Sequence, residues 1–156
     1  MKTEIVFILE QYFIDNSNFI ELLDTNNIQK QSSRFHIFVS TSYKENQFFI
    51  PLRSNIKHGS MGFSAPSSTR PNAGLDYRKA LIVNDDKYIH RPNVVKIPSS
   101  QRNHIQANIV AINNGFSNYV NGYIKSANKK REHIDSKYKF STLHNFHKEL
   151  GICKNP

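Results

Sequence analysis

The feature that most constrains the fold is a pair of β-prone runs separated by a short polar turn. Residues 34–42 and 47–52 are rich in β-branched and aromatic side chains, and residues 43–46 between them are mostly polar. This pattern predicts an antiparallel hairpin, because two extended runs joined by a few residues pair directly with each other. Polar and basic residues follow the second arm at once. We therefore expect the hairpin to present them at the end of a strand.

Further β-prone runs extend this hairpin into a mostly antiparallel sheet of about six strands. Residues 5–9 are predicted to form a buried strand, with residues 12–14 as a candidate continuation. Residues 75–83 form another strand, residues 87–89 its return partner, and residues 94–97 a further short strand. Such a sheet twists strongly, so we expect it to close partly into a barrel.

Helices are predicted beside the sheet, which makes the fold class α+β. Asn18 and Glu21 have the spacing of a capping box around a short apolar run at residues 19–23, and this predicts a helix of two turns. A short final helix is predicted over residues 142–150, because a serine precedes it and a glycine follows it.

The longest helix is predicted over residues 99–128, where apolar residues recur at steps of three and four. This seam is expected to pack against the sheet, and it consists of Ile105, Ile109, Ile112, Phe116, Tyr119 and Tyr123. Gly115 and Gly122 lie inside the helix, where each costs up to about 1 kcal/mol relative to alanine. Their presence indicates close packing or a bend.

Two connections lack a clear period. Residues 24–33 are polar and are predicted to form a loop. Residues 54–73 are rich in Gly, Ser, Pro and Thr, and loops of such length tend to be functional or disordered. This second loop either closes over a ligand or forms an ordered excursion packed through Met61 and Phe63, and the sequence leaves both interpretations open.

Charge identifies the class of partner. The 156 residues are expected to form one domain, residues 1–156, and carry 21 Lys and Arg against 12 Asp and Glu, a formal charge of +9. A polyanion is the natural partner of such a chain, and nucleic acid and anionic membrane both qualify. No apolar run approaches the ~20 residues of a spanning helix, and no signal peptide is recognised. The single cysteine, Cys153, allows no internal disulfide, so we expect a cytoplasmic protein.

The residues after the second hairpin arm are suited to RNA cleavage by the 2′-OH of the substrate. Arg53 offers a planar charged fork for a phosphate, Ser54 a hydroxyl, and Lys57 a point charge. His58 can take and give a proton near neutral pH, since a free histidine has a pKa of about 6.5. Such a reaction needs a base, an acid and cations around the phosphate. A solvated basic loop without catalytic function is the alternative.

The order of these features resembles the ToxN/AbiQ/CptN/TenpN group, the endoribonuclease toxins of type III toxin–antitoxin systems, and is most similar to its CptN/TenpN branch. The resemblance rests on strand, turn, strand, Pro-Leu-x-Ser and a nearby lysine, at residues 34–39, 43–46, 48–52, Ser54 and Lys57. Two departures are visible. Arg53 replaces a threonine common in part of the family, and the catalytic lysine is displaced and followed by His58.

The resemblance implies a PemK/MazF-like barrel that cuts RNA without a metal or cofactor and leaves 2′,3′-cyclic phosphate and 5′-OH ends. It implies a catalytic site at Ser54 and Lys57. Together with the chemistry of the side chains, this predicts four catalytic residues: His58 as acid or base, Lys57 for phosphate stabilisation or proton transfer, Arg53 as a phosphate clamp, and Ser54 for orientation. The resemblance also implies a small repeat RNA antitoxin, folded as a pseudoknot, that the toxin trims from a precursor and then binds in a hetero-oligomeric assembly. Cellular or phage RNA would be the other substrate.

Other basic and aromatic residues are candidate RNA contacts. They are Arg34, Lys44, Arg70, Asp76, Tyr77, Arg78, Lys79, Lys129, Lys130, Arg131, Lys137 and Lys139. The last five crowd the end of the long helix with Tyr138 and Phe140, as a surface for RNA backbone and stacked bases does. Asp76 either orients Lys57 or His58, or pairs with its neighbour Arg78.

The remaining histidines favour structural interpretations. His36 lies between apolar residues and is expected to be half-buried rather than a second base. His144 and His147 stand one helical turn apart, but zinc sites ordinarily need three or four protein ligands, so no metal is expected. Two alternative functions stay open: a non-catalytic RNA-binding or RNA-chaperone domain, and a protein that binds anionic membranes.

Overall fold

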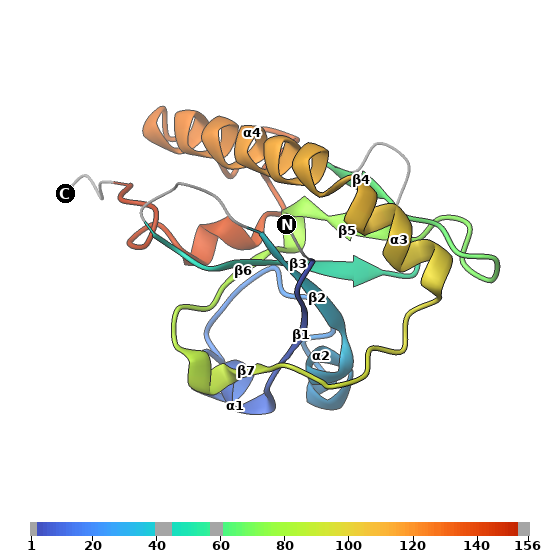
Figure 1. Ribbon diagram of the computed structural model, residues 1–156. Helices are drawn as coiled ribbons and strands as arrows, with labels where there is room; N and C mark the ends of the chain where they lie inside the picture. Colours follow the sequence, from blue (N-terminus) through green and yellow to red (C-terminus); the bar gives the residue numbers. More distant parts are fainter. Residues whose placement is uncertain (1–2, 40–44, 57–60, 153–156) are drawn as a thin grey trace.

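The computed structural model describes residues 3–39, 45–56 and 61–152. Its centre is an antiparallel sheet of seven described strands, which confirms the α+β class (Figure 1). The strands are β1 (Ile5–Ile8), β2 (Phe35–Val39), β3 (Phe48–Arg53), β4 (Gly62–Ser64), β5 (Gly74–Asp76), β6 (Leu81–Ile82) and β7 (Ile89–His90). Their order is β4-β5-β3-β2-β1-β7, and β6 also pairs with β3.

Four α-helices and three short 3-10 helices accompany the sheet in the described part of the chain. The α-helices are α1 (Glu10–Asp15), α2 (Ile28–Ser33), α3 (Ser99–Ala107) and α4 (Ile109–Asn128), and the 3-10 helices are η1 (Tyr77–Lys79), η2 (Asp86–Tyr88) and η3 (Thr142–Asn145). One long helix and three short ones match the expectation. Figure 1 shows α3 and α4 on one side of the sheet and α1 and α2 on the other.

The predicted hairpin is confirmed and forms the centre of the core. Strands β2 and β3 pair from His36 opposite Pro51 to Val39 opposite Phe48. Because side chains alternate along a strand, Phe48 points to the face covered by α4, where its ring centroid lies 5.2 Å from that of Phe116. Pro51 points to the other face, beside Phe13 of α1. Both faces of β3 are therefore buried up to its last residues.

The amino-terminal predictions after β1 are wrong. Residues 12–14 belong to helix α1, whose Tyr12 and Phe13 are buried, and Tyr12 Oη donates to the Ile82 carbonyl at 3.0 Å. This tertiary packing overrides the β propensity of the aromatic residues. The helix predicted at residues 19–23 does not form, since Glu21 has φ of 64°, which a right-handed helix excludes. Helix α2 lies instead inside the predicted loop 24–33.

The predicted strand at residues 75–83 is divided. Asp76 accepts a hydrogen bond from the Arg78 amide at 3.0 Å, and this Asp cap starts helix η1 and separates β5 from β6. The segment predicted to return beside it, residues 87–89, ends in β7, which pairs with β1 instead. Residues 94–97, all within the described part, form no strand.

Three further expectations need correction. The long helix is broken at Asn108, whose Nδ2 donates to the His104 carbonyl at 2.8 Å and so competes with the helical backbone. The final helix shortens to η3 followed by turns. The sheet is open, because its described terminal strands β4 and β7 each pair with one neighbour, so the predicted partial closure into a barrel is not found. The PemK/MazF likeness stays a prediction.

The two glycines of α4 mark close packing, as predicted. An added Cβ at Gly115 would lie 2.8 Å from Tyr77 Oη, and one at Gly122 would lie 2.1 Å from Tyr138 Oη. Both distances are below any ordinary carbon–oxygen contact. The tyrosines therefore reach the helix backbone where a side chain is missing.

We expect Gly122→Ala to lower the free energy of unfolding by about 1–3 kcal/mol through overpacking, although alanine is the better helix former. The clashing atom is the Tyr138 hydroxyl oxygen. Tyr138→Phe in the same chain should therefore recover part of the loss, which urea unfolding of both single variants and the double variant measures. A Gly122→Ala protein as stable as its parent would contradict this packing.

Candidate active site

Arginines from three segments gather at the end of β3, on the face opposite α4. Arg53 is the last residue of β3 and lies opposite Gly74 of β5, so Asp76, two residues further, is on the same face. Continuing the pairing of β2 and β3 past His36 and Pro51 places Arg34 on this face as well. The sheet register therefore brings together residues that lie far apart in the sequence.

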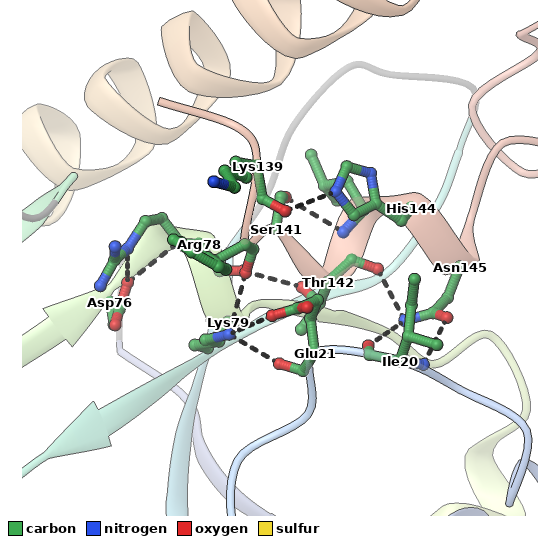
Figure 2. Close-up of polar contacts among 12 residues, drawn as sticks. Ile20, Glu21, Asp76, Arg78, Lys79, Lys139, Ser141, Thr142, His144 and Asn145 are labelled. Atoms are coloured by element: carbon green, nitrogen blue, oxygen red, sulfur yellow. Dashed lines mark hydrogen bonds and ion pairs between the residues drawn. The ribbon is translucent and has the colours of Figure 1, made fainter. Parts of the chain in front are cut away.

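Asp76 is the centre of this cluster. Its side chain is fully buried, and Oδ2 accepts a hydrogen bond from Arg53 Nη1 at 2.7 Å. Oδ1 accepts from the Arg78 amide at 3.0 Å and lies 3.5 Å from Arg78 Nε. Figure 2 shows the contacts between Asp76 and Arg78. The predicted Asp76–Arg78 pair is thus present, and a second arginine shares the carboxylate.

The two arginines keep part of their surface in solvent. The side chain of Arg53 is 25% exposed and that of Arg78 is 21% exposed, whereas the side chain of Asp76 is 0% exposed. One buried negative charge thus holds two partly exposed positive charges. Such an arrangement favours binding of an additional anion, since a fixed guanidinium presents several N–H donors in a plane.

Arg34 has its own half-buried partner, Asp24. Its Nη2 donates to Asp24 Oδ2 at 2.6 Å and its Nη1 to the Leu52 carbonyl at 3.3 Å, the residue just before Arg53. Burial raises the pKa of the Asp24 carboxyl, but the hydrogen bond and charge of Arg34 outweigh burial and hold this pKa below its ordinary value. Arg34 is therefore held in place beside the strand end instead of extending freely into solvent.

Two neighbours in this region contribute to packing. Lys79 Nζ donates to the carbonyls of Glu21 at 2.8 Å and Phe140 at 2.9 Å, which ties the 17–27 segment to the chain before η3. Burial lowers the pKa of Lys79, while the charges of Glu21 and Asp76 raise it. Tyr77 is buried and its hydroxyl donates to the Ile112 carbonyl at 3.3 Å. Both side chains have protein partners, and a structural role accounts for them.

The other predicted site residues lie as follows. Ser54 is exposed directly after β3. Lys57 and His58, and Lys44 in the hairpin turn, lie outside the described residues. Arg70 is exposed in the loop that follows β4. In the described part of residues 54–73, Phe63 of β4 stacks on His104 with ring centroids 5.3 Å apart, and Met61 packs on the core, as the ordered alternative predicts.

His36 is fully buried behind the arginine cluster. Its Nδ1 lies 3.1 Å from the Arg34 carbonyl, which can only accept, so Nδ1 carries the proton. Burial lowers the pKa of His36 to about 4, although this hydrogen bond raises it. The ring is therefore neutral near pH 7, more deeply buried than predicted, and serves the fold.

A second cationic region begins in the last turn of α4 and continues after it. Its side chains are exposed, and they belong to Lys125, Lys129, Lys130, Arg131, Lys137 and Lys139. Arg131 pairs with Asp135 at 3.2 Å. Tyr138 is buried under Gly122, so it is not available for stacking, whereas Phe140 is 48% exposed. We call residues 129–140 the basic segment.

His144 and His147, which stand one turn apart, both form hydrogen bonds with Tyr123. Tyr123 Oη lies 2.8 Å from His144 Nδ1 and 2.7 Å from His147 Nε2. His144 Nε2 lies 3.1 Å from the Lys139 carbonyl and must donate to it, so Tyr123 donates to His144 and accepts from His147. This directed chain fixes η3 against α4. Among the described residues, no group of three or more His, Cys, Asp and Glu could hold a metal ion.

Sequence reasoning missed two carboxylates beside the site, those of Asp24 and Glu21. Asp24 and Glu21 lie in a polar stretch without periodicity, and their partners Arg34 and Lys79 follow ten and 58 residues later. No spacing rule connects them. Asp24 has a φ of 54°, in the left-handed region that Asp tolerates in turns. An Asp in a polar stretch is therefore the one local indication of a turn here.

Comparison with known proteins identifies two solved structures with this fold. One is ToxN, from work on bacterial type III toxin–antitoxin systems and selective toxin inhibition by a non-coding RNA pseudoknot; it has a TM-score of 0.61 and 15% identity over 98% of this chain and 90% of that chain. The other is AbiQ, a lactococcal anti-phage endoribonuclease of a type III system, with a TM-score of 0.64 and 15% identity over 97% and 98%.

At such identity the likeness shows a shared fold over nearly the whole chain. No protein-family model matches the sequence, and no curated protein matches it. None of the helices in the described residues has the length and apolar character needed to cross a membrane.

We expect Asp76→Asn to lower the free energy of unfolding by about 1–3 kcal/mol, because it leaves two arginines without their shared buried charge. The change keeps the size of the side chain, so packing is retained. Asp86→Asn is the matched control, since Asp86 is 71% exposed and its arginine lies 3.8 Å away. Equal stability of the two variants in urea unfolding would argue against the central role of Asp76.

His36 predicts a pH dependence of stability. Its pKa is about 4 in the folded protein, below the 6.5 of a free ring, so the unfolded state binds a proton between these values and the folded state does not. Stability is therefore lost as the pH falls from 6.5 to 4, by about 3 kcal/mol from this residue. His36→Gln should remove this part of the loss, measured by urea unfolding across that range, and His90→Gln should retain it. An unchanged slope in His36→Gln would contradict the buried neutral ring.

Proposed function

We propose that this chain is the endoribonuclease toxin of a type III toxin–antitoxin system and cuts RNA by attack of the 2′-OH on the adjacent phosphate. The observation that carries the proposal is the arginine cluster around Asp76, next to exposed Ser54, on a fold shared with ToxN and AbiQ. The formal charge of +9 agrees with an RNA partner.

The cluster suits the charge that develops during this reaction. The phosphorane formed by 2′-OH attack carries more negative charge than the starting diester, and fixed guanidinium groups stabilise it without rearranging. In our proposal Arg53 binds the phosphate, with Arg78 and Arg34 beside it, and Asp76 is the positioning residue that holds Arg53 and Arg78. Ser54 donates a hydrogen bond to a reacting oxygen.

Proton transfer is assigned from the sequence. His58 is proposed to act as acid or base and Lys57 to stabilise the phosphate or transfer a proton, because both follow Ser54 within four residues. His36, which is buried and neutral, leaves this task to a group nearer the surface. The products would carry 2′,3′-cyclic phosphate and 5′-OH ends, and the reaction would need no metal ion.

The same surface would serve substrate and inhibitor. A repeat RNA folded as a pseudoknot is proposed as the antitoxin, trimmed by the toxin and retained in a toxin–RNA hetero-oligomer. The basic segment would bind its backbone through exposed cations such as Lys129, Lys130 and Lys137. Arg70 is proposed as a further phosphate contact. The same proposal includes three further points: a fold like that of PemK and MazF, membership of the CptN/TenpN branch, and a cytoplasmic location.

The test is RNA cleavage by the purified protein in EDTA. We expect fragments with cyclic phosphate ends, blocked when the nucleotide at the cut carries 2′-deoxyribose. Arg53→Ala should slow cleavage by about a hundredfold or more, as loss of one transition-state donor does. Arg91→Ala is the control, because Arg91 is an exposed arginine paired with Glu4 beside β7.

Three results would contradict the proposal in different ways. Binding of RNA without any cleavage by the parent protein would favour a non-catalytic RNA-binding domain. Cleavage unchanged in His58→Ala would remove His58 from the mechanism, while unchanged cleavage in Arg53→Ala would remove the arginine cluster.

A further inference from the structure

We propose that Phe140, with Lys139, forms a stacking subsite for one unpaired base of bound RNA; this rests on the proposed RNA function and specifies which part of the RNA this surface contacts. Phe140 is 48% exposed, and the ammonium of Lys139 lies over its ring, 5.4 Å from the centroid. An exposed ring beside a cation offers a base both a π face and a partner for the adjoining phosphate.

Exposure of this ring is unusual within the molecule. Among the described residues, Phe140 is the only aromatic side chain in the set of exposed large hydrophobic residues, and the others are aliphatic. The neighbouring aromatic residue, Tyr138, is buried and contacts Tyr119 and Tyr123. Folding thus buries one ring of this pair and leaves the other at the surface, where a base can reach it.

The backbone on both sides of the ring is fixed. The Phe140 carbonyl accepts from Lys79 Nζ at 2.9 Å, and the Lys139 carbonyl accepts from His144 Nε2 at 3.1 Å. Figure 2 shows the contact between His144 and Lys139 together with the hydrogen bond from Thr142 Oγ1 to the Arg78 carbonyl, which is 3.1 Å long. Because this backbone is already fixed, a ligand that stacks on the ring has less conformational entropy to remove from the segment.

The same contacts connect the ring with the arginine cluster. Thr142, two residues after Phe140, binds the backbone of Arg78, whose side chain contacts Asp76. In Figure 2 the Lys139 side chain extends toward the side where Arg78 and Asp76 lie. In this proposal, an RNA strand with a phosphate at Arg78 continues along this segment, and an unpaired base of that strand stacks on the Phe140 ring.

A second copy of the chain is a poorer occupant of this surface. Phe140 and Ile134 are the exposed apolar residues of the basic segment, and their neighbours are mostly lysine and arginine. A stable protein interface buries about 800 Å² on each partner, far more than two side chains supply. Like charges on two copies would also repel, whereas RNA complements them.

The chain contains no tryptophan, so Phe140→Trp introduces a single fluorescent reporter at the subsite. The probe is a short single-stranded RNA with 2′-O-methyl riboses, which 2′-OH attack cannot cut, and a duplex of matched phosphate number is the comparison. We expect the single strand to quench the Phe140→Trp fluorescence and the duplex to quench it little. Phe140→Ala should weaken single-strand binding about five- to a hundredfold, as loss of one stacked base does.

Ile134→Trp is the matched control, because Ile134 is an exposed apolar residue of the same segment. The subsite would be overturned if duplex and single strand quench the fluorescence equally, or if Ile134→Trp is quenched as strongly as Phe140→Trp. It would also be overturned if Phe140→Ala binds RNA as the parent does, or if the parent binds no RNA. Phe140→Trp fluorescence that depends on protein concentration without RNA would overturn it too. Cleavage of ordinary RNA by the parent, assayed in parallel, separates this outcome from failure of the proposed function.

Discussion

The arrangement at the end of β3 depends on one buried carboxylate. Asp76 has no exposed surface and binds Arg53 from β3 and Arg78 from η1. Burying an ionised carboxylate is costly unless it is paired and hydrogen-bonded. The positions of both arginines next to Asp76 compensate for this cost. Because the same residue caps η1, it also ends β5 and sets the direction of the chain. Two partly exposed positive charges beside the strand end follow from this single interaction.

The carboxy-terminal part of the chain is attached to the same place. Thr142 binds the Arg78 carbonyl, Lys79 binds the Phe140 carbonyl, and His144 holds the Lys139 carbonyl while Tyr123 of α4 holds His144. These contacts join a segment late in the sequence to the strand-end cluster. The molecule therefore carries two cationic regions that share a scaffold, one suited to a phosphate and one suited to a longer stretch of RNA.

Local patterns in the sequence were sufficient for the hairpin and for the glycine packing in α4, because each depends on neighbours in the chain. The Asp76–Arg53 pair spans 23 residues and depends on strand register, which no local pattern gives. Helix α1 was predicted as strand since Tyr12 and Phe13 favour strands, and only their burial in the finished core makes them helical.

The central claim is that the arginine cluster around Asp76 holds the phosphate at which RNA is cut. A crystal structure of the protein with an RNA that carries 2′-deoxyribose at the cut tests it most directly. Our account predicts that one oxygen of the phosphate at the cut lies within hydrogen-bond distance of Arg53. A second oxygen of the same phosphate should contact Arg78 or Arg34. RNA bound only to the α3 and α4 side of the sheet, with these arginines in solvent, would contradict the account.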